Sequence, residues 1–430
     1  MKKVYIETYG CTLNSADSDI LSAILKEKNY EIVDDASSSD VVVVNTCTVK
    51  GTTENKIRER VRSLVGSDKP LVIAGCMSAN EKRIRKFAPN SPILGTSSLS
   101  SIVDAVESAY KKEKPKFYGS FESKDALPKI ISAPIMRIPI NDGCTSSCNF
   151  CQTKLARPFL RSYTPKTIVK WIHEAVNSGA REIQLTSMDS GAYGLDIKTN
   201  LPSLLDKIAN DDSDEAPTST NYLVRLGMIN PNHAKRMVRE LSKFLNHFRF
   251  YKFLHLPLQS GSEKVCKEMN RDHSVEDYLK IAQSLYDSVD SFTLSTDIIV
   301  GYPTESDSDF EDTLKAIEKT KPSIVNVSRF SPRPGTKAKE LPPLPNELVK
   351  ERVATLNSLL KPILEENRRK FVGKTYPVLV TEKSKDYKGR LPNYLQVVLK
   401  DFNGELGTFV KAKIVDSSHN SLFGEIINGE

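Results

Sequence analysis

The sequence predicts an α/β protein with an N-terminal doubly wound parallel sheet, a central (β/α) barrel, partial or full, and a small C-terminal β-barrel. Three observations predict this fold. Strand-like runs alternate with helix-like segments from residue 1 to about 110, and they alternate again from about 131 to 335. Residues 371–430 change to short β-rich runs separated by Gly and Asn. A chain of 430 residues has room for these three parts.

The N-terminal part, residues 1–110, contains three strand candidates and the helices between them. The runs 40–44 and 70–74 are continuously apolar, which is typical of strands that are covered on both faces, and 3–8 is a third strand. Residues 15–28 have apolar side chains at helical spacing. Strands alternating with helices favour a parallel sheet.

The central part, residues 130–370, contains six strand candidates and ends in a bridging helix. A charged segment, 110–130, is predicted to link it to the first part, and the acidic run 211–217 is predicted to be a surface loop. The strands are expected at 136–139, 182–186, 223–228, 252–255, 293–300 and 325–330, and the helix at 346–370. In the tail, 371–430, strands are expected at 376–380, 394–398 and 407–415.

Composition limits the possible classes of protein. The net charge of +7 permits an acidic partner such as nucleic acid without requiring one. No run approaches the roughly 18 apolar residues of a membrane span, and the first residues lack the apolar core of a signal peptide. We therefore expect a soluble, cytoplasmic protein without a membrane partner. Seven cysteines in such a chain favour metal ligation or catalysis over disulfides.

Three cysteines far apart in the sequence share one local context. Cys11, Cys47 and Cys76 each follow a predicted strand. Because parallel strands end at one edge of a sheet, the three thiols are expected to converge there. Three buried core cysteines are the alternative. Three thiolates without a neighbouring histidine suit an iron–sulfur cluster with one open iron better than a closed zinc site.

The strongest signal is a second trio, Cys144, Cys148 and Cys151, with the spacing C-x3-C-x2-C and the aromatic Phe150 before the last cysteine. A compact loop of this kind lets three thiolates reach three corners of a cubane cluster, and the fourth iron stays open for a small molecule. A zinc knuckle is the alternative. The spacing and the aromatic resemble the signature of the radical S-adenosylmethionine (SAM) enzymes.

The two trios together, with the β-rich tail, resemble the methylthiotransferase family over nearly the whole chain, and the tail resembles its RNA-binding TRAM module. Several strings resemble the archaeal and eukaryotic threonylcarbamoyladenosine tRNA methylthiotransferases within it. These strings are LPK at 127–129, LTSMDSGAYG at 185–194, RLGMINP at 225–231, HLPLQSGS at 255–262, DIIVGYPTE at 297–305 and FSPRPGT at 330–336.

The resemblance implies a function and its cofactors. The enzyme would convert N6-threonylcarbamoyladenosine, just 3′ of the anticodon in tRNA, to its 2-methylthio derivative. It would use two [4Fe-4S] clusters and SAM. The second trio would hold the radical-generating cluster, and the first trio would hold the cluster that carries the donated sulfur. A tRNA substrate, an electron donor, a sulfur source and a monomeric state are also expected.

Other site residues follow from the same resemblance. Arg225 is expected to contact the cofactor or to form a salt bridge inside the barrel. Gln259 and Asp297, near strand ends, are candidates for hydrogen bonds to cofactor or substrate. Ser187 and Asp189 follow the second strand, where the superfamily contacts the cofactor's amino group, although the usual Gly-Gly-Glu is absent. Gly301 is expected to let the backbone approach the adenine, or to be a plain turn glycine.

Contact with RNA would use basic or aromatic side chains. Basic clusters lie at 56–62, 82–86 and 368–370, and each can bind phosphate or be a solvated helix face. In the tail, Tyr387 and Tyr394 could stack on bases or belong to the core. The seventh cysteine, Cys266, is expected to be a thiol without a ligand role.

Three other functions remain open from the sequence alone. The same chemistry could act on isopentenyladenosine in tRNA or on an aspartate of a ribosomal protein. A non-catalytic iron–sulfur protein that binds RNA would also carry both trios. An electron-transfer protein fits less well, because each trio leaves one iron open.

Overall fold

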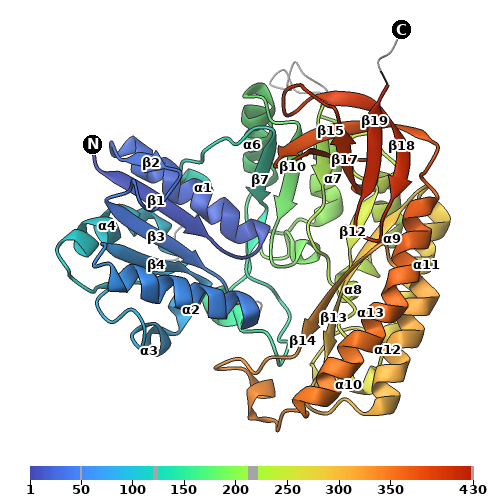
Figure 1. Cartoon of the computed structure of the whole chain (residues 1–430), viewed down its shortest axis with the longest axis horizontal. Helices are drawn as coiled ribbons and strands as arrows, with labels where there is room; N and C mark the ends of the chain where they lie inside the picture. Colours follow the sequence, from blue (N-terminus) through green and yellow to red (C-terminus); the bar gives the residue numbers. More distant parts are fainter. Residues whose placement is uncertain (49–50, 120–123, 212–220, 428–430) are drawn as a thin grey trace.

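The structure of the chain is a computed structural model that describes residues 1–48, 51–119, 124–211 and 221–427. Three parts follow one another along the chain, and in Figure 1 the N-terminal part lies beside the central one while the C-terminal part covers one end of it. The predicted α/β fold class is confirmed. Most of the acidic run at 211–217 lies outside the described residues.

The N-terminal domain is a parallel sheet of six strands with the order β2-β1-β3-β4-β5-β6. Its strands are β1 (Lys3–Thr8), β2 (Glu31–Val33), β3 (Val41–Thr46), β4 (Leu71–Gly75), β5 (Ile93–Leu94) and β6 (Lys116–Phe117). Its helices are α1 (Thr12–Glu27), α2 (Gly51–Gly66), α3 (Glu81–Ile84) and α4 (Ile102–Tyr110), with 3-10 turns at Cys76–Ala79 and Leu99–Ser101.

Strand β3 shows why the apolar runs are continuous. Val41 and Val43 pack on the face covered by α1 and α4, and Val42 and Val44 pack on the face covered by α2. All four are fully buried, because helices cover both faces of the sheet. The segment 110–130 was predicted to be a linker, but part of it forms strand β6, which extends this sheet beyond residue 110.

The central domain is an open, partial barrel. Its six parallel strands are β7 (Ile135–Pro139), β10 (Glu182–Thr186), β11 (Leu223–Arg225), β12 (Phe253–His255), β13 (Thr293–Val300) and β14 (Ile324–Arg329). They form two three-stranded sheets, and one parallel bridge between Val224 and Phe250 joins β11 to the chain just before β12. A small pair, β8 (Asn141–Asp142) and β9 (Arg161–Ser162), flanks the first strand.

Helices cover the outside of this barrel (Figure 1). They are α6 (Pro165–Asn177), α7 (Leu201–Ala209), α8 (Pro231–Ala234), α9 (Val238–Leu245), α10 (Glu263–Glu268), α11 (Val275–Ser288) and α12 (Asp307–Thr320). The short helix α5 (Thr153–Ala156) instead lies against the 3-10 turn Cys76–Ala79 of the N-terminal domain. Further 3-10 turns lie at Lys124–Ala126, Ser190–Ala192 and Lys337–Glu340. The long helix α13 (Asn346–Arg369) runs along the outside and leads to the C-terminal domain.

Strand β11 is shorter than the predicted 223–228. A Cβ on Gly227 would lie 2.3 Å from the Ser190 hydroxyl and 2.9 Å from the Leu185 carbonyl oxygen. After Arg225 the chain therefore leaves the strand pairing and passes close against the end of β10, where only glycine fits at position 227.

The C-terminal domain is a closed barrel of five strands with the order β15-β16-β17-β19-β18. The strands are β15 (Thr375–Lys383), β16 (Tyr387–Arg390), β17 (Gln396–Lys400), β18 (Phe409–Ser417) and β19 (Leu422–Ile426). The sequence predicted three of them and missed β16 and β19.

The C-terminal barrel packs against the amino-terminal ends of the central strands. The ring of Tyr394 lies 4.8 Å from the rings of Tyr251 and Phe253, and its hydroxyl donates to the buried carboxylate of Glu182 at 3.2 Å. This contact closes the end of the central barrel opposite to the strand ends that carry the candidate site. Tyr394 therefore belongs to the contact between domains, and Tyr387 packs on Phe402.

Candidate active site

The first cysteine trio lies along one edge of the N-terminal sheet. Cys11, Cys47 and Cys76 directly follow, or nearly follow, β1, β3 and β4, which are neighbours in the sheet. Cys11 is the N-cap residue of α1 and is exposed, whereas the other two thiols are buried. The predicted convergence at the carboxyl edge is therefore what the topology produces.

Two glycines allow the backbone segments that carry the first cysteine trio to lie close together. Gly10 has a φ of +115°, and a Cβ there would lie 2.9 Å from the sulfur of Cys47. Gly75 has a φ of +85°, and a Cβ there would lie 2.3 Å from the side-chain oxygen of Asn45 and 2.5 Å from the Thr46 carbonyl oxygen. Both positions combine a left-handed backbone with a lack of space, so only glycine fits.

The charge environment of Cys76 links it to the other two thiols. Burial raises the pKa of this thiol to about 12, the guanidinium of Arg157 opposes that rise, and Cys11 and Cys47 add to it. A buried thiol of this kind is protonated unless a metal takes the place of the proton. The influence of Cys11 and Cys47 on this pKa shows that both lie near Cys76.

The second trio lies in the loop between β8 and α5. The backbone N–H of Ser146 donates to the buried sulfur of Cys144 at 3.4 Å, and the guanidinium of Arg271 donates to the sulfur of Cys148 at 3.3 Å. Burial raises the pKa of Cys144 to about 11, with Asp189 adding to the rise. Burial also raises the pKa of Cys148, against the influence of Arg271.

Each trio offers three thiolates, a donor set that suits an iron–sulfur cluster. A cubane cluster binds each thiolate to a different iron, so its ligands lie farther apart than those of one ion. Arg157 beside the first trio and Arg271 beside the second also supply positive charge that an anionic cluster requires.

A buried ionic cluster fastens the two cysteine loops to each other. Asp17 of α1 pairs with Lys124 at 2.7 Å and with Arg157, and Asp142 pairs with the same two cations. Asp17, Lys124 and Arg157 are each at most 4% exposed. Asp142 precedes the second trio by two residues, and Arg157 follows it. Two carboxylates and two cations balance, so the cluster can be buried without an excess charge.

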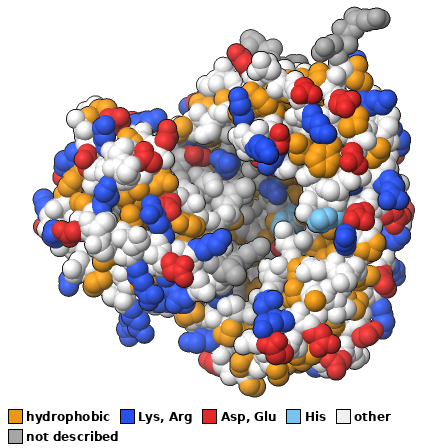
Figure 2. Space-filling view, viewed as in Figure 1, with side chains coloured by type: hydrophobic (Ala, Val, Ile, Leu, Met, Phe, Trp, Pro, Cys, Tyr) orange, Lys and Arg blue, Asp and Glu red, His pale blue; other side chains and the backbone are white. Residues whose placement is uncertain are grey.

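A cleft of about 1350 Å³ lies between the N-terminal domain and the central barrel. Figure 2 shows the molecular surface hollowed between these two parts. Cys11 and Cys47 line one side, Gln259 and Asp297 line the other, and Phe150 of the second loop also borders the cleft. Cys76, Cys144, Cys148 and Cys151 do not line it.

Gln259 and Asp297 occupy the wall of the cleft formed by β13 and its neighbours. Gln259 has a φ of +71°, and its backbone N–H donates to the Asp297 carbonyl oxygen at 2.8 Å. The carboxylate of Asp297 lies 3.0 Å from Nε2 of His255 and accepts a hydrogen bond from Asn326 at 2.9 Å. These side chains form a polar wall on the side of the cleft opposite to Cys11.

Ser187 and Asp189 lie in the turn after β10, next to the second cysteine loop. Asp189 is fully buried, and its two oxygens accept hydrogen bonds from the backbone of Gly191 at 3.0 Å and from the side chain of Asn230 at 2.6 Å. Ser187 shares a hydrogen bond of 2.8 Å with Ser190. Asp189 thus stabilises the turn after β10.

The structure places the last two predicted site residues outside the cleft lining. The guanidinium of Arg225 lies 5.1 Å from the ring centre of Phe253 and 5.5 Å from that of Tyr394, toward the end closed by the C-terminal domain. Gly301 has a φ of +80°, and a Cβ there would lie 2.6 Å from Val349 of α13. Packing of that helix explains this glycine.

Comparison with known proteins assigns the chain to a family. A probable threonylcarbamoyladenosine tRNA methylthiotransferase of Pyrococcus horikoshii is 38% identical over 99% of this chain and all of its own length. That of Archaeoglobus fulgidus is 40% identical over 99% of this chain and 98% of its own length. The human threonylcarbamoyladenosine tRNA methylthiotransferase is 33% identical over all of this chain and 74% of its own length. This chain belongs to the threonylcarbamoyladenosine tRNA methylthiotransferases.

Three family descriptions match successive parts of this methylthiotransferase. Residues 3–95 match the uncharacterized protein family UPF0004, 138–317 match the radical SAM superfamily, and 369–427 match the TRAM domain. The resemblance drawn from the sequence is confirmed. None of the described helices combines the length and the apolar character that a membrane crossing requires.

Solved structures share the fold at low identity. The radical SAM methyltransferase TsrM of Kitasatospora setae, with tryptophan and a SAM analogue bound, has a TM-score of 0.58 at 12% identity, covering 79% of this chain and 75% of that one. The cobalamin-dependent radical SAM enzyme OxsB has a TM-score of 0.51 at 9% identity, covering 85% of this chain and 56% of that one. The similarity extends beyond the central barrel.

The contacts of several residues in the methylthiotransferase site could not be predicted from the sequence. His255 and Asn326 meet Asp297 only through the parallel pairing of β12, β13 and β14. Arg271 reaches Cys148 from more than a hundred positions away. Cys266 is 1% exposed and lies in the core of the central domain.

Proposed function

We propose that this chain converts N6-threonylcarbamoyladenosine next to the tRNA anticodon to its 2-methylthio derivative by radical SAM chemistry. One observation carries the proposal: a single cleft is bordered by Cys11 and Cys47 on one side and by Phe150, Gln259 and Asp297 on the other. A nucleoside in this cleft would face both cysteine loops. The full-length relatives with this activity in their names support the same substrate.

We infer that each trio holds one [4Fe-4S] cluster. Cys144, Cys148 and Cys151 would bind the cluster that binds SAM, and Cys11, Cys47 and Cys76 would bind the second. When bound, these groups supply the radical and the methylthio sulfur, which no side chain can supply. The thiolate-only donor sets and the neighbouring cations Arg157 and Arg271 support this assignment.

The chain itself would orient the reactants. The hydrogen bond from Arg271 fixes the sulfur of Cys148, and Asp189 holds the turn beside Cys144. Asp297, kept in place by His255 and Asn326, would accept hydrogen bonds from SAM or the nucleoside. Gln259, with a backbone fixed by its pairing to Asp297 and Ile299, would donate from the same wall.

Arg225 and Gly301 would act from outside the cleft lining. Arg225 would hold the barrel wall from within, and Gly301 would let α13 pack closely. Ser187 would support the turn after β10 beside Asp189.

Three functional units follow from this proposal: residues 1–110, with β6 added, for the second cluster, 130–370 for SAM and the radical, and 371–430 for tRNA. The TRAM match supports the last of these. An electron donor and a sulfur source would complete the reaction, and we infer a cytoplasmic monomer.

Nucleoside mass spectrometry of tRNA tests the substrate. A strain lacking the gene should lose 2-methylthio-N6-threonylcarbamoyladenosine and accumulate its unmodified precursor, and the wild-type gene should restore it. Methylthio loss from isopentenyladenosine, or from a ribosomal-protein aspartate, with the threonylcarbamoyl nucleoside unchanged, would refute the proposal. A purified protein that binds tRNA but never yields 5′-deoxyadenosine with SAM and a reductant would be a binding protein.

A further inference from the structure

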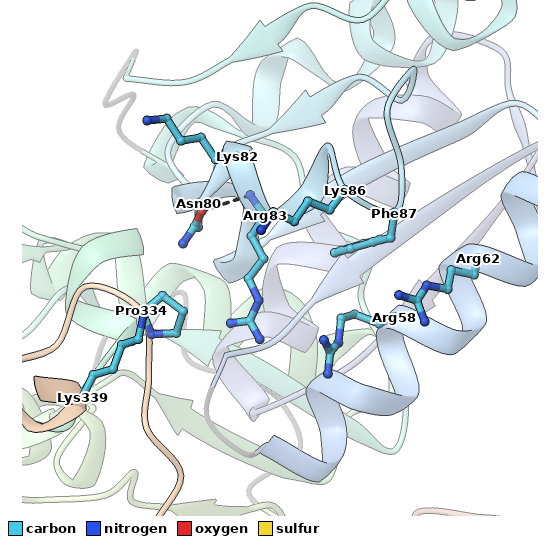
Figure 3. Close-up of a pocket in the computed structure, with 9 residues that line it drawn as sticks. All are labelled: Arg58, Arg62, Asn80, Lys82, Arg83, Lys86, Phe87, Pro334 and Lys339. Atoms are coloured by element: carbon cyan, nitrogen blue, oxygen red, sulfur yellow. Dashed lines mark hydrogen bonds between the residues drawn. The ribbon is translucent and has the colours of Figure 1, made fainter. Parts of the chain in front are cut away.

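A second hollow, of about 380 Å³, lies at the rim of the cleft on the N-terminal domain (Figure 3). Its lining combines six basic side chains with three uncharged ones and contains no Asp or Glu. The lining residues are Arg58, Arg62, Asn80, Lys82, Arg83, Lys86, Phe87, Pro334 and Lys339. We refer to these residues as the basic hollow.

Three segments that are distant in the sequence build the basic hollow. Arg58 and Arg62 are four residues apart on α2, so they share one face of that helix. The short helix α3 and the turn after it carry the cations between Lys82 and Lys86. Pro334 and Lys339 come from the loop after β14 and close the hollow from the central domain (Figure 3). In Figure 2, Lys and Arg side chains gather over the same part of the N-terminal domain.

Most of this charge is not balanced by the protein. Arg83 pairs with the buried carboxylate of Glu54, which Arg333 also contacts at 2.8 Å. Among the residues that the structure describes, Arg62, Lys86 and Lys339 have no carboxylate within ion-pair distance. These three side chains are also exposed. A concave surface with several unpaired cations attracts a polyanion.

The basic hollow is continuous with the cleft, because Arg58 and Arg83 line both. A nucleotide placed in the cleft beside Cys11 would therefore direct its neighbouring backbone phosphates across these two arginines into the hollow. The TRAM-like barrel lies at the opposite end of the central strands, so it cannot supply these contacts.

We propose that the basic hollow binds the backbone phosphates of tRNA that adjoin the nucleoside in the cleft. This inference rests on the proposed function, since it takes the substrate to be a tRNA. An acidic protein, such as an electron donor, is the other polyanion to consider. A protein interface is expected to have an exposed apolar centre, whereas the only aromatic in the hollow, Phe87, is 6% exposed. Phosphates need only charge and hydrogen-bond donors.

The test compares tRNA binding by the wild-type protein and the triple variant Arg62→Gln/Lys86→Gln/Lys339→Gln. These substitutions leave Arg83, with its buried ion pair, unchanged. Affinity for tRNA carrying N6-threonylcarbamoyladenosine is measured between about 50 and about 200 mM salt. Three lost contacts to single-stranded phosphates should make the salt-dependent loss of affinity about 20-fold smaller in the variant. SAM cleavage without tRNA should be unchanged.

A matched control removes the same charge elsewhere. Lys26 in the last turn of α1, Lys28 directly after that helix and Lys111 directly after α4 are exposed at the opposite edge of the N-terminal sheet. The variant Lys26→Gln/Lys28→Gln/Lys111→Gln should keep the wild-type salt dependence, which separates a local contact from the effect of net charge.

Two results would overturn the inference. In the first, the hollow variant loses affinity with salt as steeply as the wild type. In the second, tRNA binding is unchanged and reduction by an acidic electron-transfer protein slows relative to dithionite, which would assign the hollow to a protein reductant. Failure of the proposed function would be seen separately, as absence of methylthio product with wild-type protein that still binds tRNA.

Discussion

The buried ionic cluster of Asp17, Lys124, Asp142 and Arg157 predicts a specific pattern of unfolding free energies. Asp17→Asn keeps the shape of the side chain but leaves two buried cations facing one carboxylate. Lys124→Met keeps most of the side-chain stem but leaves two carboxylates facing one cation. Each substitution thus creates one unbalanced charge among side chains of which Asp17, Lys124 and Arg157 are nearly inaccessible to solvent and Asp142 is partly exposed.

The magnitude follows from the cost of such a charge. Removal of one partner from a buried ion pair typically lowers the free energy of unfolding by about 3–5 kcal/mol. The double variant Asp17→Asn/Lys124→Met restores the balance, because Arg157 and Asp142 still pair with each other. Its cost should therefore be smaller than the sum of the two single costs, by about 1–3 kcal/mol.

The single tryptophan of the chain provides the assay. Trp171 lies on α6 of the central domain and is 8% exposed, so its fluorescence follows unfolding of the domain that holds Asp142 and Arg157. Urea denaturation of the wild type, both single variants and the double variant gives the four free energies. The matched control, Asp68→Asn, breaks an ion pair with Lys112 that is exposed on both sides and should change little.

If the double variant lost as much free energy of unfolding as the two single variants together, the reasoning would be refuted, since the charges would then not compensate one another. A cost of Asp17→Asn no larger than that of Asp68→Asn would also refute it. Either result would mean that the buried ionic cluster does not hold the two cysteine loops in place.

Three further predictions concern the cysteine loops and the acid stability. Cys11→Ala should keep SAM cleavage, measured as 5′-deoxyadenosine, and lose methylthio transfer, whereas Cys148→Ala should lose both; equal losses would argue against separate roles for the two trios. Gly10→Ala should lower the iron content per chain, because its Cβ would meet the sulfur of Cys47 at 2.9 Å, while Gly66→Ala, which has open space, should not; equal iron content in the two would contradict the steric argument. Burial and the neighbouring Arg271 lower the pKa of His273 to about 3, so below about pH 6.5 the unfolded chain binds a proton that the folded chain does not. Stability should therefore fall as the pH drops, by about 2 kcal/mol at pH 5; His273→Gln should remove this loss in urea denaturation at pH 7 and 5, and the exposed His419→Gln should not.

The sequence predicted those parts of the fold and site that depend on local pattern. The run of valines at 41–44 identified a doubly covered strand, and Cys47 after it could then be placed at the sheet edge. The spacing of Cys144, Cys148 and Cys151 within one loop needed no tertiary information at all. In both cases the position along the chain determines the position in space, because a strand or a short loop connects the two.

Other features depend on contacts between distant segments and were not predictable. Nothing near Arg225 indicates that Phe253 and Tyr394 lie over its guanidinium, since Tyr394 comes from another domain. Gly301 has the pattern of a ligand-site glycine, yet the atoms that a Cβ would meet belong to Val349. The hydrogen bond from Arg271 to Cys148 joins a loop to a residue after α10 that has no motif of its own.

The proposed chemistry depends on where one cysteine trio lies relative to the other. Residues outside both cysteine motifs hold the two trios in that arrangement. Thr12, next to Cys11, shares a hydrogen bond of 2.7 Å with Thr186 at the end of β10, and Asp17 one turn later meets Lys124 and Arg157. Lys124 comes from a segment that has the composition of a linker. A charged side chain in such a segment is expected to be exposed to solvent. Lys124 instead joins the two domains, because it pairs with the carboxylates of Asp17 and Asp142. A substitution there should therefore affect transfer of the methylthio group more than either cluster's own assembly.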